Sequence, residues 1–533
     1  MTDTTANSRP APTTHLPTPA VQASTSTLLY DEPEWTFDLV QNVYDAVEEI
    51  GVGEMGLDIY PNQIEVISSE QMLDAYASIG MPSMYRHWSF GKHFAREESA
   101  YRKGARALAY ELVINSDPCI NYIMEENTMT MQTLVIAHAA MGHNHFFKNN
   151  YLFKQWTDAT SILDYLTFAK EYVAECEERY GVETVEAVLD SAHALMNQGV
   201  SRHPQPRRTL NLDREKARKR RAHEEATYNE LWRTIPRSQL PPVEPSSAAS
   251  EARGGKHDLG LPQENVLYFL EKHAPKLEDW KRELIRIVRM LAQYFYPQRQ
   301  TKVMNEGCAT FVHYEILNRM YDRGQISEGA MLEFMHSHSS VVFQPSFDQP
   351  FYSGMNPYAL GFAMMQDIKR ICEDPTSEDK DWFPDLAGSG DALGALKDAW
   401  ADFRDDSFIL QYLSPKLIRD FRLFQLHERS DSPFLQVEAI HDEAGYRAVR
   451  QRLAAQYDAS ARDPDIQVVS ADLSGTRRLN LFHRVRNGIL LDKAECDRTL
   501  LHVAHLWGYR VKMFEVDAES GETLREHEAL PMP

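Results

Sequence analysis

Apolar residues recur at helical spacing over most of this chain, and this periodicity constrains its fold more than any other feature. Between Trp35 and Val47, large apolar side chains fall three and four residues apart, as on one buried face of a helix. The pattern continues to about Gln198 and resumes from about Leu261 to Leu413. The sequence therefore predicts a mainly α N-terminal and central domain. Further helical segments are expected at 161–179, 182–196, 283–296 and 302–321.

Two segments interrupt this pattern. Residues 1–27 are rich in Thr, Pro, Ala and Ser, and we expect a disordered tail because they cannot bury enough surface to offset the entropy of ordering. Residues 203–257 combine scattered prolines with a charged run at 213–225 that holds several Lys and Arg residues. We interpret this stretch as a polar, basic insertion with one solvated helix, inside a helical domain that spans 28–413. A nucleic-acid role for the basic run is the weaker alternative.

The periodicity changes after Ser414, where strand-like and helix-like segments alternate. The order is strand, helix, strand, strand, helix, strand, which is the βαββαβ order of the ferredoxin-like pattern. We therefore predict a small α+β domain over 414–533. The expected elements lie at 434–441, 445–456, 465–473, 477–485, 493–506 and 509–516.

Charge and cysteine content limit the class of protein. The formal net charge of -22 disfavours nonspecific binding to nucleic acid or to anionic membranes. The five cysteines are far apart and include no CxxC, which argues against a disulfide framework or a thiolate zinc site and is typical of a reducing compartment. No stretch approaches the ~20 apolar residues of a membrane span, and the N-terminus lacks a signal-peptide pattern. We expect a cytoplasmic protein without a nucleic-acid partner.

The segment from Ile136 to Asn150 holds three histidines among small and apolar residues: His138, His143 and His145. Imidazole is the commonest side-chain metal ligand. The spacing of five between the first two is wider than the four that matches the α-helical pitch, so a helix that ends or bulges at Gly142 would be needed to bring them together. The alternative is a set of polar or capping histidines near a helix end, and the residues alone leave both interpretations open.

A second constellation lies on the predicted helix at 302–321. Glu306 and His313 are seven residues apart, so they lie two turns apart on one face with Thr310 between them. The face continues into Leu317 and therefore points partly inward. A carboxylate and an imidazole facing the interior indicate a metal half-site or a Glu–His hydrogen bond. The alternative is a buried polar pair whose hydrogen bonds are satisfied.

Three further segments carry weaker signals. The aromatic and basic stretch 85–94 is interpreted as a packing loop, with a pocket or anion site as the alternative. The stretch 125–128 is interpreted as a helix N-cap with first-turn acids, and the alternative is that its carboxylates reach the histidines. His336 and His338 are expected at a surface or in a turn.

The glycine-rich stretch 51–56 matches GxGxxG, but it follows a helical pattern instead of a strand, and no helix clearly begins after it. We interpret it as a flexible turn, with a short hairpin expected over 51–66. The motifs GxxxxGK[ST], HExxH and GxSxG do not occur. Their absence excludes a Walker-type phosphate loop, the usual zinc-peptidase helix and a hydrolase serine elbow.

Taken together, these segments resemble the SpoVR family. The resemblance extends from Trp35 to the C-terminus, and its motifs are specific in combination. Membership implies an intracellular bacterial protein without a settled activity, tied to sporulation in spore formers and to stress physiology elsewhere. It also implies a PrkA-type serine protein kinase and a von Willebrand A-like protein as partners. The stretches that carry the resemblance are YRHWSFGKHF at 85–94, NSDPCINYIMEENTMT at 115–130, HAAMGHNHFFKNN at 138–150 and MNEGCATFVH at 304–313.

The family's His-x-x-x-Gly-His-like element corresponds to His138 and His143. Its Asn-Glu-Gly-x-Ala element also resembles the helix that supplies the carboxylate ligand in gluzincin-type metallopeptidases, an analogy at the level of fold. Because HExxH is absent, another carboxylate must activate water if hydrolysis occurs, and Glu125, Glu126 and Glu111 are the candidates. The Asn-Glu-Gly-x-Ala positions here are Asn305, Glu306, Gly307 and Ala309.

Two functions stay open. In the first, the chain is a metal-dependent hydrolase in which a divalent metal, zinc most of all, keeps an open position for water. In the second, it is a non-catalytic regulatory or scaffold protein that acts with the PrkA-type kinase and the von Willebrand A-like protein. The first function requires four side chains to converge at one interior point. The expected ligands are His138, His143, Glu306 and His313.

Overall fold

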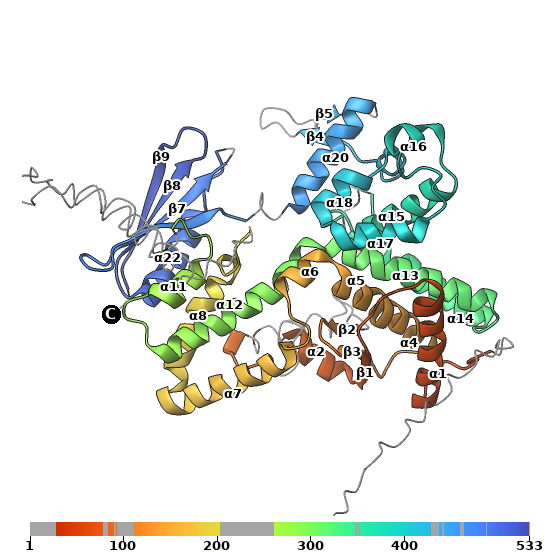
Figure 1. Cartoon of the computed structure of the whole chain (residues 1–533), viewed down its shortest axis with the longest axis horizontal. Coiled ribbons are helices and arrows are strands. Elements are labelled where there is room, and N and C mark those ends of the chain that lie inside the picture. The colour runs from red at the N-terminus through yellow and green to blue at the C-terminus, as the bar shows by residue number, and fades with distance from the viewer. Residues whose placement is uncertain are drawn as a thin grey trace, which may run out of the picture.

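The computed structural model is mostly helical (Figure 1). Its helices gather around two hydrophobic cores. This confirms the mainly α fold class with a smaller α+β region at the C-terminus. The predicted tail at 1–27 and the predicted insertion at 203–257 lie outside the residues that the structure describes. Those residues are 28–77, 84–89, 92, 111–202, 259, 261–346, 349, 352–427, 436–439, 442–458, 463–486 and 488–531.

Helices from distant parts of the sequence build the first core. Helix α13 (Lys302–Asp322) packs against α15 (Pro357–Glu373) on one side and against η2 (Ala137–His143) on another. Phe311 and Trp400 are among its largest fully buried side chains. The other helices of this core are α1 (Phe37–Glu48), α4 (Met129–Ile136), α5 (Asn144–Asn149), α6 (Tyr151–Trp156), α14 (Glu328–Val341), α17 (Ala392–Asp402), α18 (Asp405–Tyr412), α19 (Pro415–Asp420) and α20 (Glu443–Tyr457).

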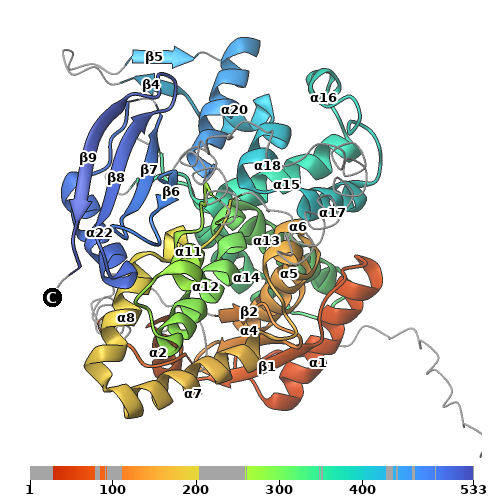
Figure 2. The same ribbon diagram turned by 60° about the vertical axis from the view of Figure 1, so that its left-hand side comes forward.

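The second core joins helices of the middle of the chain to its C-terminal region. Helix α12 (Asp279–Gln300) packs against α8 (Val182–Ala194) and α11 (Val266–His273), and α8 packs against α22 (Lys493–Trp507). Figure 2 shows α22 between α8 and the C-terminal strands. Helix α7 (Ile162–Tyr180) adds its apolar face to the same core. The C-terminal strands and α22 are therefore joined to helices that lie far away in the sequence.

The C-terminal sheet has the strand order β6-β7-β8-β9. Strand β6 (Ile466–Ala471) pairs antiparallel with β7 (Leu479–Val485), and β9 (Thr523–Ala529) pairs antiparallel with β8 (Val511–Asp517). Strands β7 and β8 are parallel, and α22 connects them as a crossover helix. Buried and less buried residues alternate along β7 and most of β8, as expected for strands covered on one side.

This topology differs from the ferredoxin-like order that the sequence suggested. The expected first strand and helix exist as β5 (Gln436–Ala439) and α20, but β5 pairs with β4 (Gln425–His427) in a separate two-stranded sheet. Helix α20 buries Tyr446 and Val449 in the first core instead of covering the four-stranded sheet. Periodicity identifies an amphipathic helix without specifying the core that receives its apolar face.

A three-stranded sheet lies next to the histidine segment. Its order is β1-β3-β2, with β1 (Asn62–Ile67) parallel to β3 (Cys119–Met124) and β2 (Glu111–Ile114) antiparallel to β3. The hairpin expected over 51–66 is wrong, because β1 pairs with a strand that lies far along the chain. The glycine-rich stretch before it forms the π-helix η1 (Glu49–Glu54).

Two close helix crossings hold α13 in place. A Cβ atom on Gly142 of η2 would lie 2.5 Å from the Cα of Ala309. On another side of α13, a Cβ atom on Gly361 of α15 would lie 2.8 Å from the Cα of Gly307 and closer still to the carbonyl oxygen of Val303. Only small residues allow backbones to approach so closely, so these glycines determine how near η2 and α15 come to α13.

The N-terminus of α13 is fixed by a residue from another helix. Asp405, the first residue of α18, accepts hydrogen bonds from the backbone N–H groups of Val303 and Met304, each at 2.9 Å. A carboxylate at this position satisfies donors that have no intrahelical partner and interacts favourably with the helix dipole. It anchors α13 just before Asn305 and Glu306.

Within the described part of the chain, no helix combines the length and apolar character that crossing a membrane would need.

We expect Gly361→Ala to destabilise the protein, because its new methyl group would meet backbone atoms of α13 that cannot move aside independently. The cost should be about 1–3 kcal/mol, as for other overpacked sites, and should appear as a drop of several degrees in the melting temperature. Gly53→Ala is the matched control, because a Cβ there meets nothing within 4 Å. Equal melting temperatures for the two variants would contradict the close crossing.

Candidate functional site

A π-helical turn brings two of the predicted histidines onto one face. The segment η2 runs from Ala137 to His143 and follows α4 without a break. A π-helix bonds residue i to residue i+5, so it aligns side chains at a spacing of five. The rings of His138 and His143 therefore lie with their centroids 4.7 Å apart. This confirms the helix bulge that their spacing required, and Gly142 within it allows α13 to approach.

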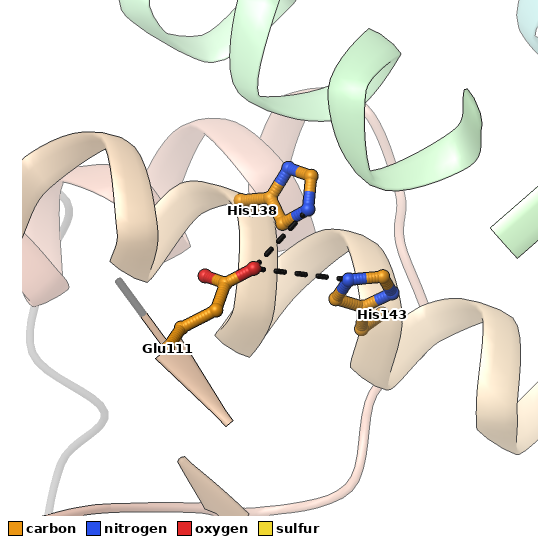
Figure 3. Close-up of side chains that lie close together, drawn as sticks. All are labelled: Glu111, His138 and His143. Atoms are coloured by element: carbon orange, nitrogen blue, oxygen red, sulfur yellow. Dashed lines mark ion pairs between the residues drawn. The ribbon is translucent and has the colours of Figure 1, made fainter. Parts of the chain in front are cut away.

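Two carboxylates from separate elements face these imidazoles. Glu111 begins strand β2, and its Oε1 lies 3.2 Å from His138 Nε2 and 3.8 Å from His143 Nε2 (Figure 3). Glu306 comes from α13, and its Oε2 lies 3.6 Å from His143 Nε2 and 4.0 Å from His138 Nε2. All four side chains are largely buried. We call Glu111, His138, His143 and Glu306 the His/Glu cluster.

Asn305 fixes the tautomer of His143. The Nδ1 atom of His143 lies 2.9 Å from Oδ1 of Asn305. An amide oxygen can only accept, so Nδ1 carries a proton, and Nε2 of the ring faces the carboxylates. This arrangement, in which the second ring nitrogen is bound to a neighbouring acceptor, is typical of metal-ligating histidines.

His313 lies behind His138, on the side away from the carboxylates. Its Nδ1 is 2.9 Å from Nδ1 of His138, and its Nε2 is 2.9 Å from Nδ1 of His338. The structure thus brings three of the four expected ligands, His138, His143 and Glu306, together beside Glu111. His313 contacts the ring of one of them, and both of its nitrogens are engaged by other imidazoles.

The three candidate catalytic carboxylates differ in where the structure places them. Glu111 lies in the His/Glu cluster, whereas the side chains of Glu125 and Glu126 are exposed. Glu126 accepts a hydrogen bond from the backbone N–H of Ser69, and Thr128 caps α4 by accepting from Met131. The stretch before α4 therefore caps this helix, in agreement with the N-cap interpretation.

Two features of the site were not anticipated. His338 was expected at a surface or turn, yet it is buried, while His336 is exposed. The sequence did contain a signal for this burial, because His338 continues the buried stripe of Ala330 and Phe334 at four-residue spacing along α14. The second feature is Thr310, whose buried hydroxyl makes no hydrogen bond to the described residues.

Two other candidate segments are structural. His145 accepts a hydrogen bond at Nδ1 from the backbone N–H of Asp58 at 3.0 Å and meets Trp400 edge-on. In the described part of the stretch 85–94, Tyr85 is buried and its hydroxyl contacts His193 of α8, while Trp88 donates to Asp190 of the same helix. These contacts support packing of that stretch against α8.

Burial dominates the protonation of this region. It lowers the pKa values of His138 and His313 well below their usual range, with neighbouring imidazoles acting in the same direction, and lowers the pKa of His338 to about 4. Burial, followed by the charge of Glu306, raises the pKa of Glu111 well above its usual range. Burial thus opposes a charge on these imidazoles and on the carboxyl of Glu111.

The His/Glu cluster fits a divalent cation on three observations. First, ligand atoms about 2.0–2.2 Å from a tetrahedral zinc are about 3.3–3.6 Å apart, close to the 3.2–4.0 Å separations of these atoms. Second, Oε2 of Glu306 is buried and accepts no hydrogen bond from the described residues. Third, two carboxylates and one divalent cation sum to zero charge, which removes the cost of burying the carboxylates alone.

Comparison with known proteins gives a consistent result over nearly the whole chain. A family model described as "SpoVR like protein" matches residues 34–462, and one described as "SpoVR-like C-terminal domain" matches residues 464–518. A relative named "Uncharacterized protein YcgB", from Escherichia coli (strain K12), is 55% identical over 498 residues, which is 93% of this chain and 95% of the relative. No solved structure matches the chain significantly.

With a chelator present, we expect the melting temperature to fall between pH 7 and pH 5. Unfolded imidazoles, with pKa values near 6.5, take up protons there that buried His138, His313 and His338 resist, so their stabilisation is lost as the pH falls. The raised pKa of Glu111 acts in the opposite sense, because its stabilisation is lost as the pH rises. Because three imidazoles act against one carboxyl, the net effect should be a lower melting temperature at pH 5.

His338→Asn removes one of these titrating rings, so its stability should depend less steeply on pH. The difference should approach about 1.4 kcal/mol per pH unit, the effect of one proton, between pH 6.5 and the pKa of about 4. His336→Asn, at an exposed position on the same helix, should follow the wild type. A His338→Asn profile parallel to that of the wild type would show that His338 is not buried in its neutral form.

Proposed function

The chain belongs to the SpoVR family, and on that premise we propose that it is a metal-dependent, hydrolase-like protein of bacterial sporulation or stress physiology. The observation that carries the proposal is the convergence of two imidazole Nε2 atoms with Oε1 of Glu111 and Oε2 of Glu306, from three separate elements, at one buried point. His138, His143 and Glu306 would hold the metal, with zinc the first candidate, and Glu111 would act as general base.

The donor set and its surroundings support this division of roles. Two histidines and one glutamate are the protein ligands of a common class of catalytic zinc site, which keeps one position open. The contact of His143 with Asn305 engages Nδ1 of that ring, and the contact of His138 with His313 does the same, so neither contact occupies an Nε2 atom. His313, expected from the sequence as a ligand, is better suited to orient His138.

Glu111 is the carboxylate best placed for proton transfer. A bound zinc ion supplies a Lewis acid that lowers the pKa of coordinated water to about 7. Oε1 of Glu111 lies within 3.8 Å of both Nε2 atoms, so it faces the space between them and can accept a proton there. Its position at the start of a paired strand keeps it in place without help from α13. Glu111 thus takes the role that the missing HExxH glutamate would have had.

We expect purified protein to contain about one divalent metal per chain by elemental analysis. His143→Ala and Glu306→Ala should lose it, because three protein ligands are the minimum for this class of site. Glu111→Gln should retain it, since the proposed base is not a ligand. His336→Ala is the control, an exposed histidine that should have no effect. Wild-type protein free of stoichiometric metal would end the proposal.

Activity separates a catalytic site from a structural one. Against a fluorogenic peptide library, wild-type protein should show chelator-sensitive hydrolysis, and Glu111→Gln should reduce it by about 10²–10⁴-fold while keeping its metal. Loss of metal in Glu111→Gln would instead indicate four protein ligands and a closed, structural centre. Metal-free protein that still captures a PrkA-type kinase or a von Willebrand A-like protein would favour the regulatory function.

A further inference from the structure

We propose that His313 and His338 are positioning residues that fix the tautomer of His138 through a row of three imidazoles. This inference rests on the proposed function and extends it to α14, which contributes no ligand. The row runs from Nδ1 of His138 to Nδ1 of His313, and from Nε2 of His313 to Nδ1 of His338. Both contacts are 2.9 Å long, and all three side chains are buried.

These distances identify the contacts as hydrogen bonds. Nitrogen atoms bound to the same zinc ion at about 2.0–2.1 Å would be more than 3 Å apart, so an N···N distance of 2.9 Å leaves no room for a cation between the rings. It lies within the range of hydrogen-bond lengths in proteins. In each contact one nitrogen must carry the proton and the other must accept it.

Only one direction of proton donation along the row is compatible with a ligand at Nε2 of His138. When Nε2 of His138 gives its lone pair to a cation, Nδ1 of that ring carries the proton and donates to His313. His313 then accepts at Nδ1 and carries its proton on Nε2, from which it donates to His338. His338 accepts at Nδ1 and carries its proton on Nε2. Each ring keeps one proton, and only one of the two possible directions remains.

The aromatic surroundings of His338 favour its role as the acceptor at the end of the row. Its ring is enclosed by Phe334, Phe362 and Tyr314, with centroids 5.7, 4.7 and 5.0 Å away. A ring in such an apolar environment favours its neutral form. A neutral imidazole at this position can accept the proton of His313 at Nδ1, whereas an imidazolium could not.

The test measures zinc affinity by competition with a chelating dye, using the full chain. His338→Phe keeps a ring among the aromatic side chains but removes the acceptor, and should weaken zinc binding by about 10–100-fold. His338→Asn restores an acceptor oxygen near the place of Nδ1 and should bind almost as tightly as the wild type. His336→Phe, exposed and two residues away on α14, should bind as the wild type does.

Nitrogen-15 NMR of histidine-labelled, zinc-loaded protein gives a second measurement, with the His338 signals assigned by their loss in His338→Asn. We expect His338 to be protonated at Nε2 and unprotonated at Nδ1. Protonation at Nδ1, or equal zinc affinity in His338→Phe and the wild type, would overturn the inference while leaving the proposed function intact. Wild-type protein that binds no zinc would overturn both.

Discussion

The close crossing of η2 and α13 is the contact on which the site depends. Gly142 lies so near Ala309 that a single methyl group at the former would overlap the backbone of the latter. With the helices at this distance, Nε2 of His143 comes within 3.6 Å of Oε2 of Glu306. A wider crossing would leave the imidazoles and the carboxylate apart, as ordinary buried polar groups. The packing at Gly307 and Gly361 holds α13 from another side.

Polar contacts then orient the groups that the crossing brings together. Each histidine of the His/Glu cluster has its Nδ1 bound to a side chain of α13, Asn305 for His143 and His313 for His138. Both Nε2 atoms consequently face the carboxylates. One helix therefore supplies a carboxylate and both orienting groups, while strand β2 supplies Glu111 from outside. Asp405 completes this arrangement by anchoring the N-terminus of α13.

This geometry gives a physical meaning to the Asn-Glu-Gly-x-Ala element. Asn305 orients an imidazole, Glu306 faces both imidazoles, Gly307 admits α15, and Ala309 admits η2. The sequence indicated His138, His143 and Glu306 as partners, and it indicated that a helix ending or bulging at Gly142 would align the histidines. It assigned His313 to the same group because Glu306 and His313 share one helix face, yet a shared face does not specify which neighbour each side chain meets.

The sequence by itself determined the helices, the family and the residue types able to bind a metal, because helical periodicity and the chemistry of side chains are local properties. Only the tertiary structure decided that Glu111 and not Glu125 or Glu126 joins the histidines, and that His338 is buried behind His313. It also decided that α20 packs in the first core and that β9 completes the C-terminal sheet. These outcomes depend on contacts between segments far apart in the chain, whose relative placement follows from packing of the whole fold.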